Sequence, residues 1–354
     1  MKIKAVKAYR RLLALKKPYT IARDTFYDAE IVFFEVELEN GMRGMGAANT
    51  DVDVVGESAD DTLTNLQSDA VMQLAGKDIR NFLPHIQLYR EVFSKYPGTQ
   101  AAIDMALHDA FCQCIGISVL DFYGRRHEKM LTSVTIGIKN VAETLEEAQE
   151  YYDGGFRALK VKTGREAELD AERIIKLREA YGAHFVIRVD ANTGYDLSQL
   201  KTFIRLTDGQ QVELIEQPFL PGMEDELLQL PMQTRAILAA DESLKNTHSA
   251  FTLAQQKAFG IFNIKMMKCG GITSAFEIAT IAAQAGISLF WGCNDESMVG
   301  ITAALHAAFA CPHTKYIDLD GSLDLMEDVA IKGFSIKDGY MMPNNLPGFG
   351  LTYL

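Results

Sequence analysis

Apolar runs rich in β-branched residues alternate with amphipathic segments along the chain from about residue 131 onward. The first three runs, LTSVTIGI, RALKVKT and FVIRVDAN, each precede a segment with the periodicity of a helix. The alternation continues through VELIEQP, AILAADES, IFNIKMM, SLFWGCN and YIDLDG, so the pattern predicts eight strands between residues 131 and 321. Eight strand–helix units favour a TIM-like (β/α)8-type barrel, modified where the last helix is reduced or replaced, over an open doubly wound sheet.

The pattern before the barrel predicts an α+β capping domain. We expect the cap over residues 1–125, completed by about 322–354, and the barrel over 126–321. Two loop-like stretches, 16–30 and 48–58, are candidates for a lid over the barrel mouth. Within the cap the expected elements are two strands at KIKAVKAYRRLL and AEIVFFEVELENG, a turn at GMGAA and a helix at AAIDMALHDAFCQCIG.

Composition narrows the class of protein. The 354 residues can hold one barrel of roughly 200–250 residues and a smaller companion domain. No apolar run approaches the ~20 residues of a membrane span, and the start MKIKAVKAYR lacks the apolar core of a secretory signal, so we expect a cytoplasmic protein without a membrane partner. The net charge of −12, without a Lys/Arg-rich run, argues against nucleic-acid binding.

Three carboxylates recur at nearly constant spacing at the ends of predicted strands. Asp190, Glu216 and Asp241 are separated by 26 and 25 residues, about one strand, one helix and two loops. Successive units of a parallel barrel would therefore deliver one carboxylate each to a common rim. Such a group requires a cation, and hard oxygen ligands favour Mg²⁺ over zinc.

Lysines flank this carboxylate set. Lys160 and Lys162 lie two apart on a predicted strand, so both side chains point to one face, and each should disfavour the other's charge. We expect one lysine pKa to fall until the amine can act as a base near neutral pH. Lys265 ends a strand four positions further round the barrel and would approach from the opposite side. Such a site suits removal of a proton α to a carboxylate, and two opposed bases permit epimerisation.

The motifs KVK, VDAN, IEQP, ADES and NIKMMKCGGIT together resemble the muconate-lactonizing subgroup of the enolase superfamily. The resemblance covers essentially the whole chain. It implies Asp190, Glu216 and Asp241 as ligands of one Mg²⁺ per subunit, Lys162 and Lys265 as the acid/base pair, and Lys160 as their electrostatic helper. It also implies a homo-oligomer. The alternative Lys268, three residues beyond Lys265, is expected to leave the inward register.

A pair of aspartates near the eighth strand indicates the substrate. Asp318 and Asp320 in YIDLDGS share a face, and their two negative charges favour the binding of an ammonium group. This element resembles that of the dipeptide epimerases, including the L-Ala-D/L-Glu epimerases, which invert the α-carbon of the second residue. Turn formation by DLDGS is the competing explanation.

Two further residues enter the predicted site. Arg23 resembles a position that contacts an acidic second side chain, unless the loop shifts by one residue and brings Asp24 there instead. Asn192 can hold Asp190 or a water of the metal, although an Asn-Thr-Gly turn explains it nearly as well.

Three other functions compete with the epimerase. A cycloisomerase or o-succinylbenzoate synthase shares the fold, but its substrate carries no ammonium group and would leave Asp318 and Asp320 unpaired. A Schiff-base lyase would use Lys162 or Lys265 as a nucleophile without a metal. A non-catalytic binding protein on the same barrel would not need the lysines and carboxylates.

Overall fold

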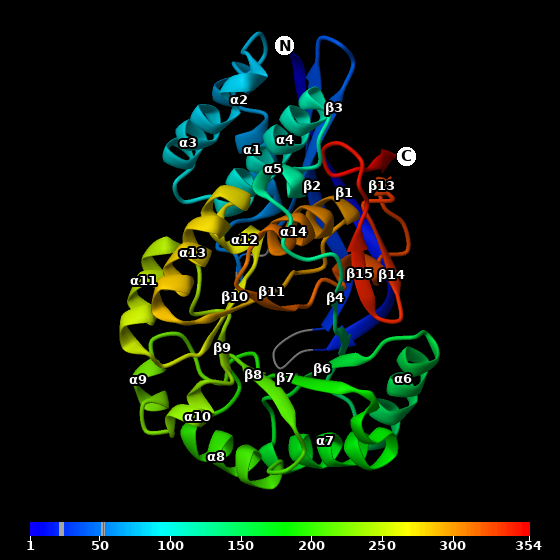
Figure 1. Ribbon diagram of the computed structural model, residues 1–354, viewed down its shortest axis with the longest axis vertical. Helices are drawn as coiled ribbons and strands as arrows, with labels where there is room; N and C mark the ends of the chain where they lie inside the picture. Colours follow the sequence, from blue (N-terminus) through cyan, green and yellow to red (C-terminus); the bar gives the residue numbers. More distant parts are fainter. Residues whose placement is uncertain (21–24, 51, 53) are drawn as a thin grey trace.

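The computed structural model describes residues 1–20, 25–50, 52 and 54–354. Its central feature is an eight-stranded parallel sheet in which neighbours in sequence are neighbours in space (Figure 1). A parallel bridge between Thr132 and Ile317 joins the last strand to the segment before the first, as closure of a barrel requires. The predicted fold class and all eight strands are thus confirmed. The strands are β5 (Val134–Ile136), β6 (Ala158–Lys162), β7 (Val186–Asp190), β8 (Val212–Glu216), β9 (Leu238–Ala240), β10 (Ile261–Ile264), β11 (Ser288–Trp291) and β12 (Thr314–Ile317).

Helices cover the outside of the barrel, and several of them begin at a residue whose side chain caps the helix. Asn140, Asp196 and Asn246 cap three of them by accepting a hydrogen bond from the backbone N–H three residues on. The strand β12 is followed by the short 3₁₀ turn η3 (Gly321–Leu323) in place of a full helix. The helices are α6 (Val141–Asp153), α7 (Ala167–Tyr181), α8 (Leu197–Leu206), α9 (Glu224–Leu227), α10 (Met232–Arg235), α11 (Thr247–Gln256), α12 (Met266–Cys269), α13 (Ile272–Ala285) and α14 (Met298–Ala310), with the 3₁₀ turn η2 (Gly182–His184) after α7.

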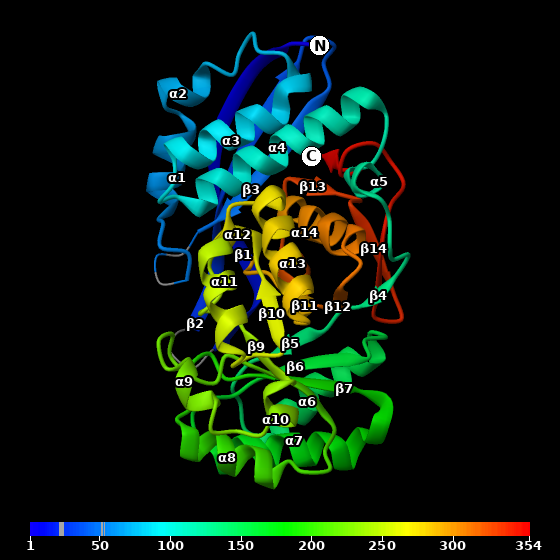
Figure 2. The ribbon, with the colours of Figure 1, turned by 60° about the vertical axis from the view of Figure 1, so that its left-hand side comes forward.

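The amino-terminal part forms an antiparallel sheet with helices against it, at the end of the molecule opposite α7 and α8 (Figures 1 and 2). Both termini lie toward this end. None of the helices in the described ranges has the length and apolarity needed to cross a membrane. The elements are β1 (Ile3–Thr20), β2 (Thr25–Leu38), β3 (Arg43–Asn49), α1 (Ala59–Leu66), α2 (Asp69–Met72), η1 (Ile79–Asn81), α3 (Phe82–Val92), α4 (Pro97–Ile115) and α5 (Val119–Tyr123).

The expected turn at GMGAA is wrong, since these residues lie within β3. A Cβ on Gly44 would lie 2.3 Å from the carbonyl oxygen of Ala106, and one on Gly46 would lie 1.9 Å from that of Ala102. The glycines therefore allow β3 to lie directly on α4, and the chain reverses earlier, at Gly41 with φ of +83°.

The first lid candidate is not a loop over most of its length. Residues from Lys16 to Thr20 continue β1, and those from Thr25 continue β2, with Tyr19 paired to Phe26. This hairpin reaches the barrel, where the backbone N–H of Lys16 donates to the carbonyl of Asp324 at 2.7 Å. Strand pairing satisfies backbone groups that a free loop would leave to water.

The carboxyl-terminal segment returns to the cap, as expected for residues 322–354. The N–H of Phe349 donates to Asp109 Oδ1 at 2.8 Å, and the Tyr353 hydroxyl donates to Asp109 Oδ2 at 3.0 Å. Figure 1 shows its strands beside the junction of barrel and cap. The assignment of exact domain boundaries stays a prediction. The remaining strands are β4 (Met130–Leu131), β13 (Ala330–Ile331), β14 (Phe334–Lys337), β15 (Tyr340–Pro343) and β16 (Thr352–Tyr353).

Candidate active site

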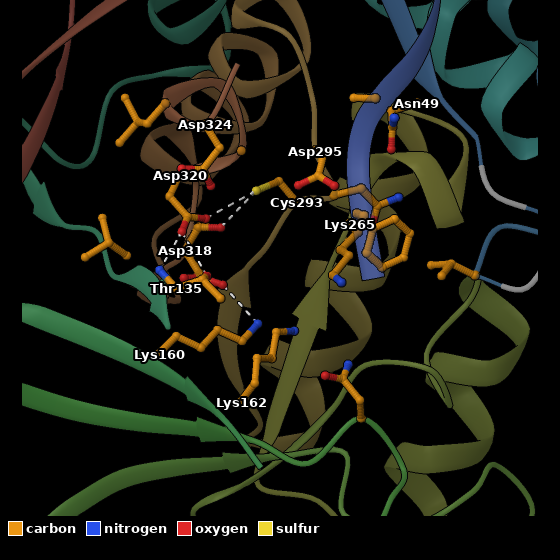
Figure 3. Close-up of a pocket in the computed structure, with 18 of the residues that line it drawn as sticks. Asn49, Thr135, Lys160, Lys162, Lys265, Cys293, Asp295, Asp318, Asp320 and Asp324 are labelled. Carbon is orange, nitrogen blue, oxygen red and sulfur yellow. Dashed lines mark hydrogen bonds and ion pairs between the residues drawn. The ribbon is translucent and has the colours of Figure 1, made fainter. Parts of the chain in front are cut away.

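A cavity of about 830 Å³ lies at the carboxyl ends of the barrel strands, where active sites of this architecture are found. Its walls come from strand ends and from the β1–β2 hairpin, which contributes Lys16, Lys17 and Phe26. Figure 3 shows the charged side chains that reach into it, including Lys160 and Asp320. Residues from nearly every barrel strand therefore meet in one enclosed space.

The three carboxylates predicted from their spacing come together. In the sheet register Asp190 pairs with Glu216, and Asp241 follows the next strand, β9. All three side chains are buried. Each faces a lysine: Lys162 Nζ lies 2.8 Å from Asp190, Lys160 Nζ lies 2.8 Å from Glu216, and Lys265 Nζ lies 2.9 Å from Asp241.

The three carboxylates offer oxygen ligands that fit a hard divalent cation, and a lysine ammonium group lies against each of them. No group of three or more His, Cys, Asp or Glu side chains within the described ranges is arranged around a common point as metal ligands. Glu216 Oε2 is buried, and its ion-pair partner is Lys160 Nζ at 2.8 Å. Burial and the neighbouring Asp190 raise the pKa of Glu216 to about 8. A set of three buried carboxylates that offers only oxygen donors is the kind of site that Mg²⁺ occupies.

The expectation that one lysine of the Lys160–Lys162 pair has a lowered pKa is wrong for Lys160. Burial alone would lower the pKa of Lys160, but Asp318, Glu216 and Asp190 together raise it well above its ordinary value. Burial would also lower the pKa of Lys265, but the attraction of Asp241 opposes this effect, and the pKa of Lys265 is raised. The attraction of the surrounding carboxylates, which come from other strands, outweighs both burial and the repulsion between neighbouring ammonium groups.

Lys162 and Lys265 reach the cavity from opposite walls. Lys162 ends β6 and Lys265 follows β10, and three strands of the eight-stranded sheet separate β6 from β10. Both side chains line the cavity, and Figure 3 shows them entering it from different strands. The arrangement can present one amine to each face of a small molecule held between them.

Lys268, which was expected to leave the inward register, does not line the cavity but contacts the metal-ligand candidate Asp241. Lys265 is the N-cap of the single-turn helix α12, so Lys268 lies three residues further on, about one helical turn away. Its buried ammonium donates to both the backbone carbonyl and Oδ1 of Asp241. Burial lowers the pKa of Lys268, although Asp241 opposes this. Helical spacing after NIK, ended by two glycines, is the signal that could have found it.

Asp318 and Asp320 both reach the cavity but differ in environment. Lys160 Nζ donates to Asp318 at 3.0 Å, and this lysine keeps the pKa of Asp318 below its usual value against the effect of burial. Asp320 accepts hydrogen bonds from the backbone N–H and hydroxyl of Thr135 at 2.9 and 2.8 Å. Burial, then Asp318 and Asp324, raise the pKa of Asp320 to about 8. Asp320 is therefore the member of the pair that still favours a cation.

Asn192 contacts two carboxylates, Asp190 of the predicted metal site and its neighbour Glu242. Its backbone N–H donates to Asp190 Oδ1 at 2.9 Å, and its amide donates to Glu242 Oε1 at 3.3 Å. Arg23 and Asp24 lie outside the residues that the structure describes.

Several cavity or supporting residues were missed in the sequence. Asn263 on β10 donates to Glu216 at 2.7 Å, and Ser133 donates to Asp318 at 2.5 Å. Burial and Asp241 raise the pKa of Glu242, which lines the cavity, to about 7. The outer wall also contains Asp28, Asp295 and Asp324, so acidic side chains extend from Asp320 toward the cap.

Comparison with known proteins agrees with this architecture. Two family descriptions match, "Mandelate racemase / muconate lactonizing enzyme, N-terminal domain" over residues 4–124 and "Enolase C-terminal domain-like" over residues 143–354. The chain is 46% identical to the L-Lys-D/L-Arg epimerase of Methylococcus capsulatus, with 100% of this chain and 99% of that protein covered. It is 29% identical to the L-Ala-D/L-Glu epimerase of Bacillus subtilis, with 99% and 97% covered.

The three-dimensional similarity extends over the full length. The crystal structure of a dipeptide epimerase from Methylococcus capsulatus, complexed with Mg and the dipeptide L-Arg-D-Lys, superposes with a TM-score of 0.97 at 45% identity and covers 100% of both chains. The resemblance identified from the KVK, VDAN, IEQP and ADES motifs is thus confirmed. Sequence and structure together establish that this chain belongs to the mandelate racemase and muconate lactonizing enzyme family of the enolase superfamily.

Proposed function

We propose that the protein is a Mg²⁺-dependent dipeptide epimerase that inverts the α-carbon of the second residue. The observation that carries this proposal is the placement of Lys162 and Lys265 on opposite walls of one cavity, beside buried carboxylates. Epimerisation requires a proton to leave one face of a carbon and a proton to arrive on the other. Two amines on opposed strands meet that requirement.

Asp190, Glu216 and Asp241 would hold the Mg²⁺. When bound, Mg²⁺ supplies positive charge beside the substrate carboxylate and makes the adjacent α-proton more acidic. The burial of three carboxylates at the ends of successive strands supports the assignment, and burial together with the neighbouring Asp190 raises the pKa of Glu216. Asn192 would keep Asp190 in place through its backbone N–H.

The lysines would carry the proton in both directions. In the L-to-D direction one amine accepts the α-proton while the opposite ammonium donates to the other face, and the roles reverse for the return. Asp241 favours the protonated form of Lys265, which therefore stands ready as a donor. Lys160, held by Asp318 and Glu216, would stay charged and stabilise negative charge that develops between the two bases.

The dipeptide's amino terminus would bind at Asp320. The hydroxyl and the backbone N–H of Thr135 both donate to Oδ2 of Asp320. The Asp320 pKa of about 8 indicates that a nearby cation would stabilise the ionised carboxylate. An ammonium group is the cation that a dipeptide carries at the end opposite its carboxylate. Asp318 would act less directly, since it already pairs with Lys160.

We propose cationic dipeptides, of the lysine and arginine type, as the preferred substrates, in place of the L-Ala-D/L-Glu preference expected from the sequence. The relative named for Lys and Arg substrates is 46% identical, against 29% for the one named for Ala and Glu. The outer wall with Asp28, Asp295 and Asp324 supports this choice, because carboxylates attract guanidinium and ammonium groups and repel an acidic side chain.

The competing functions fit less well. A cycloisomerase or o-succinylbenzoate synthase substrate would leave Asp320 facing Asp318 and Asp324 without a cation. A Schiff-base lyase needs no metal, whereas buried carboxylates that fit a cation lie beside both Lys162 and Lys265. Homo-oligomer formation stays a prediction.

The test is proton exchange at the α-carbon. The protein with Mg²⁺ in D₂O should add one deuterium to L-Lys-L-Arg or L-Arg-L-Lys faster than to L-Ala-L-Glu. K162A and K265A should each reduce epimerisation on the order of 10²–10⁴-fold. K201A, at an exposed position of α8, is the matched control. Binding of Mg²⁺ without exchange in any dipeptide would refute the proposal.

A further inference from the structure

Lys268 contacts the carboxylate set from outside the cavity. Lys268 is a buried residue of α12 and is not one of the residues that line the cavity. Its ammonium group donates to two acceptors of one residue, the carbonyl oxygen and Oδ1 of Asp241. It therefore has no direct access to a substrate between Lys162 and Lys265.

The two oxygens of Asp241 are divided between two lysines. Lys268 donates a hydrogen bond to Oδ1 of Asp241, and Lys265 Nζ lies 2.9 Å from Oδ2. A carboxylate held at one oxygen and at its own backbone cannot rotate freely about its side-chain bonds. The position of Oδ2, and with it the direction of the Lys265 ammonium, thus depends on the contact that Lys268 makes.

The cap fixes the turn that carries Lys268. Gly270 and Gly271 follow α12 with φ of +92° and +105°. A Cβ at these positions would lie 2.5 Å from Gln100 Oε1 and 2.6 Å from Asp104 Cβ, both on α4 of the cap. Asp104 also accepts from the N–H of Ile272 at 2.8 Å, at the start of α13. The helix turn is therefore clamped directly after Lys268.

We propose that Lys268 is a positioning residue: it orients Asp241 so that Lys265 is aligned with its face of the substrate, and the cap helix α4 sets Lys268 through the Gly270–Gly271 turn. The inference rests on the proposed two-base epimerisation. It predicts an effect on one face of the α-carbon, because Asp241 contacts Lys265, whereas Lys162 forms its ion pair with Asp190.

The test compares K268M and K268R with K201M, in which the same change is made at an exposed position of α8. Initial deuterium incorporation is measured separately from each epimer of one dipeptide. K162A and K265A in the same assay assign each face to its lysine. Mn²⁺ affinity, followed by electron paramagnetic resonance, and thermal unfolding are recorded for every variant.

In K268M we expect exchange on the Lys265 face to fall on the order of 10–100-fold more than exchange on the Lys162 face, as for a misaligned reacting group. The dissociation constant for Mn²⁺ should stay within about threefold or decrease, since a competing positive charge has been removed. K268R should recover part of the lost exchange, and K201M should match the wild type.

An equal loss on both faces, or Mn²⁺ binding weakened in proportion to activity, would overturn the role of Lys268 and make it a support of the whole carboxylate set. Unchanged exchange on both faces would also overturn it. If K268M does not fold, K268R decides between the outcomes by the ratio of the two faces. A wild type that exchanges no dipeptide would instead refute the proposed function.

Discussion

Thr135 on the first barrel strand donates two hydrogen bonds to Asp320, which follows the last strand 185 residues later. The backbone N–H and the hydroxyl both bind Oδ2, at 2.9 and 2.8 Å. This contact spans the closure of the barrel and fixes the carboxylate that we assign to the substrate's amino terminus. Its strength should therefore be visible in substrate binding.

Replacement of Thr135 by Val keeps the shape of the side chain but removes the hydroxyl donor. The carboxylate of Asp320 should then be harder to ionise, and KM for a dipeptide should rise roughly 5–30-fold, as for loss of one hydrogen bond to a charged group. The change in kcat should be smaller. T135S, which retains the hydroxyl, is the control, and a KM equal to that of T135V would contradict the assignment.

Replacement of Asp320 by Asn tests the ammonium site directly. For a free dipeptide kcat/KM should fall on the order of 30-fold or more, because the charged partner of the ammonium is lost. An N-acetylated dipeptide has no ammonium group, so the wild type and D320N should process it at similar low rates. An equal loss for both substrates would show that Asp320 serves the architecture of the site and does not bind the amino terminus.

Replacement of Asp324 by Asn tests the preference for cationic side chains. This carboxyl lines the cavity, and burial followed by Asp295 raises its pKa to about 6. We expect KM for L-Lys-L-Arg to increase about 3–10-fold. The increase should be smaller at high salt, because screening weakens the attraction between the Asp324 carboxylate and a cationic substrate. The matched change at exposed Asp208 should have no effect. Equal increases for L-Ala-L-Ala and L-Lys-L-Arg would contradict a charge-based role.

His306 predicts a pH dependence of stability away from the site. It is buried, and burial followed by Arg125 lowers its pKa to about 3. Below its ordinary pKa of 6.5 the unfolded chain takes up a proton that the folded protein refuses, so the free energy of unfolding falls as pH decreases. Between pH 6.5 and 5 this contribution reaches about 2 kcal/mol.

The measurement is urea unfolding of wild type and H306Q at pH 7.5 and pH 5. H306Q should lose less stability between the two pH values than the wild type, whatever its stability at pH 7.5. The quantity compared is the change in the free energy of unfolding between the two pH values, because other buried groups titrate in both proteins. An identical change in the wild type and H306Q would mean that His306 accepts a proton in the folded state.

Local sequence patterns determined the architecture and the first set of candidate residues. A parallel barrel places the carboxyl ends of all its strands on one rim, so the spacing of Asp190, Glu216 and Asp241 was sufficient to bring them together. The same rule placed Lys162 and Lys265 on opposite walls. Order along the chain is also order around the barrel, and no distant contact is needed to deduce it.

Only the tertiary structure decided how these groups are charged and which others join them. The pKa of Lys160 is raised because carboxylates from β7, β8 and the end of β12 surround it, and a single strand shows none of them. Thr135 meets Asp320 only through closure of the barrel, and Lys268 reaches Asp241 because α12 begins directly after Lys265. Periodicity specifies faces and ends of elements, whereas electrostatics depends on distances between residues remote in sequence, and those distances exist only in the folded chain.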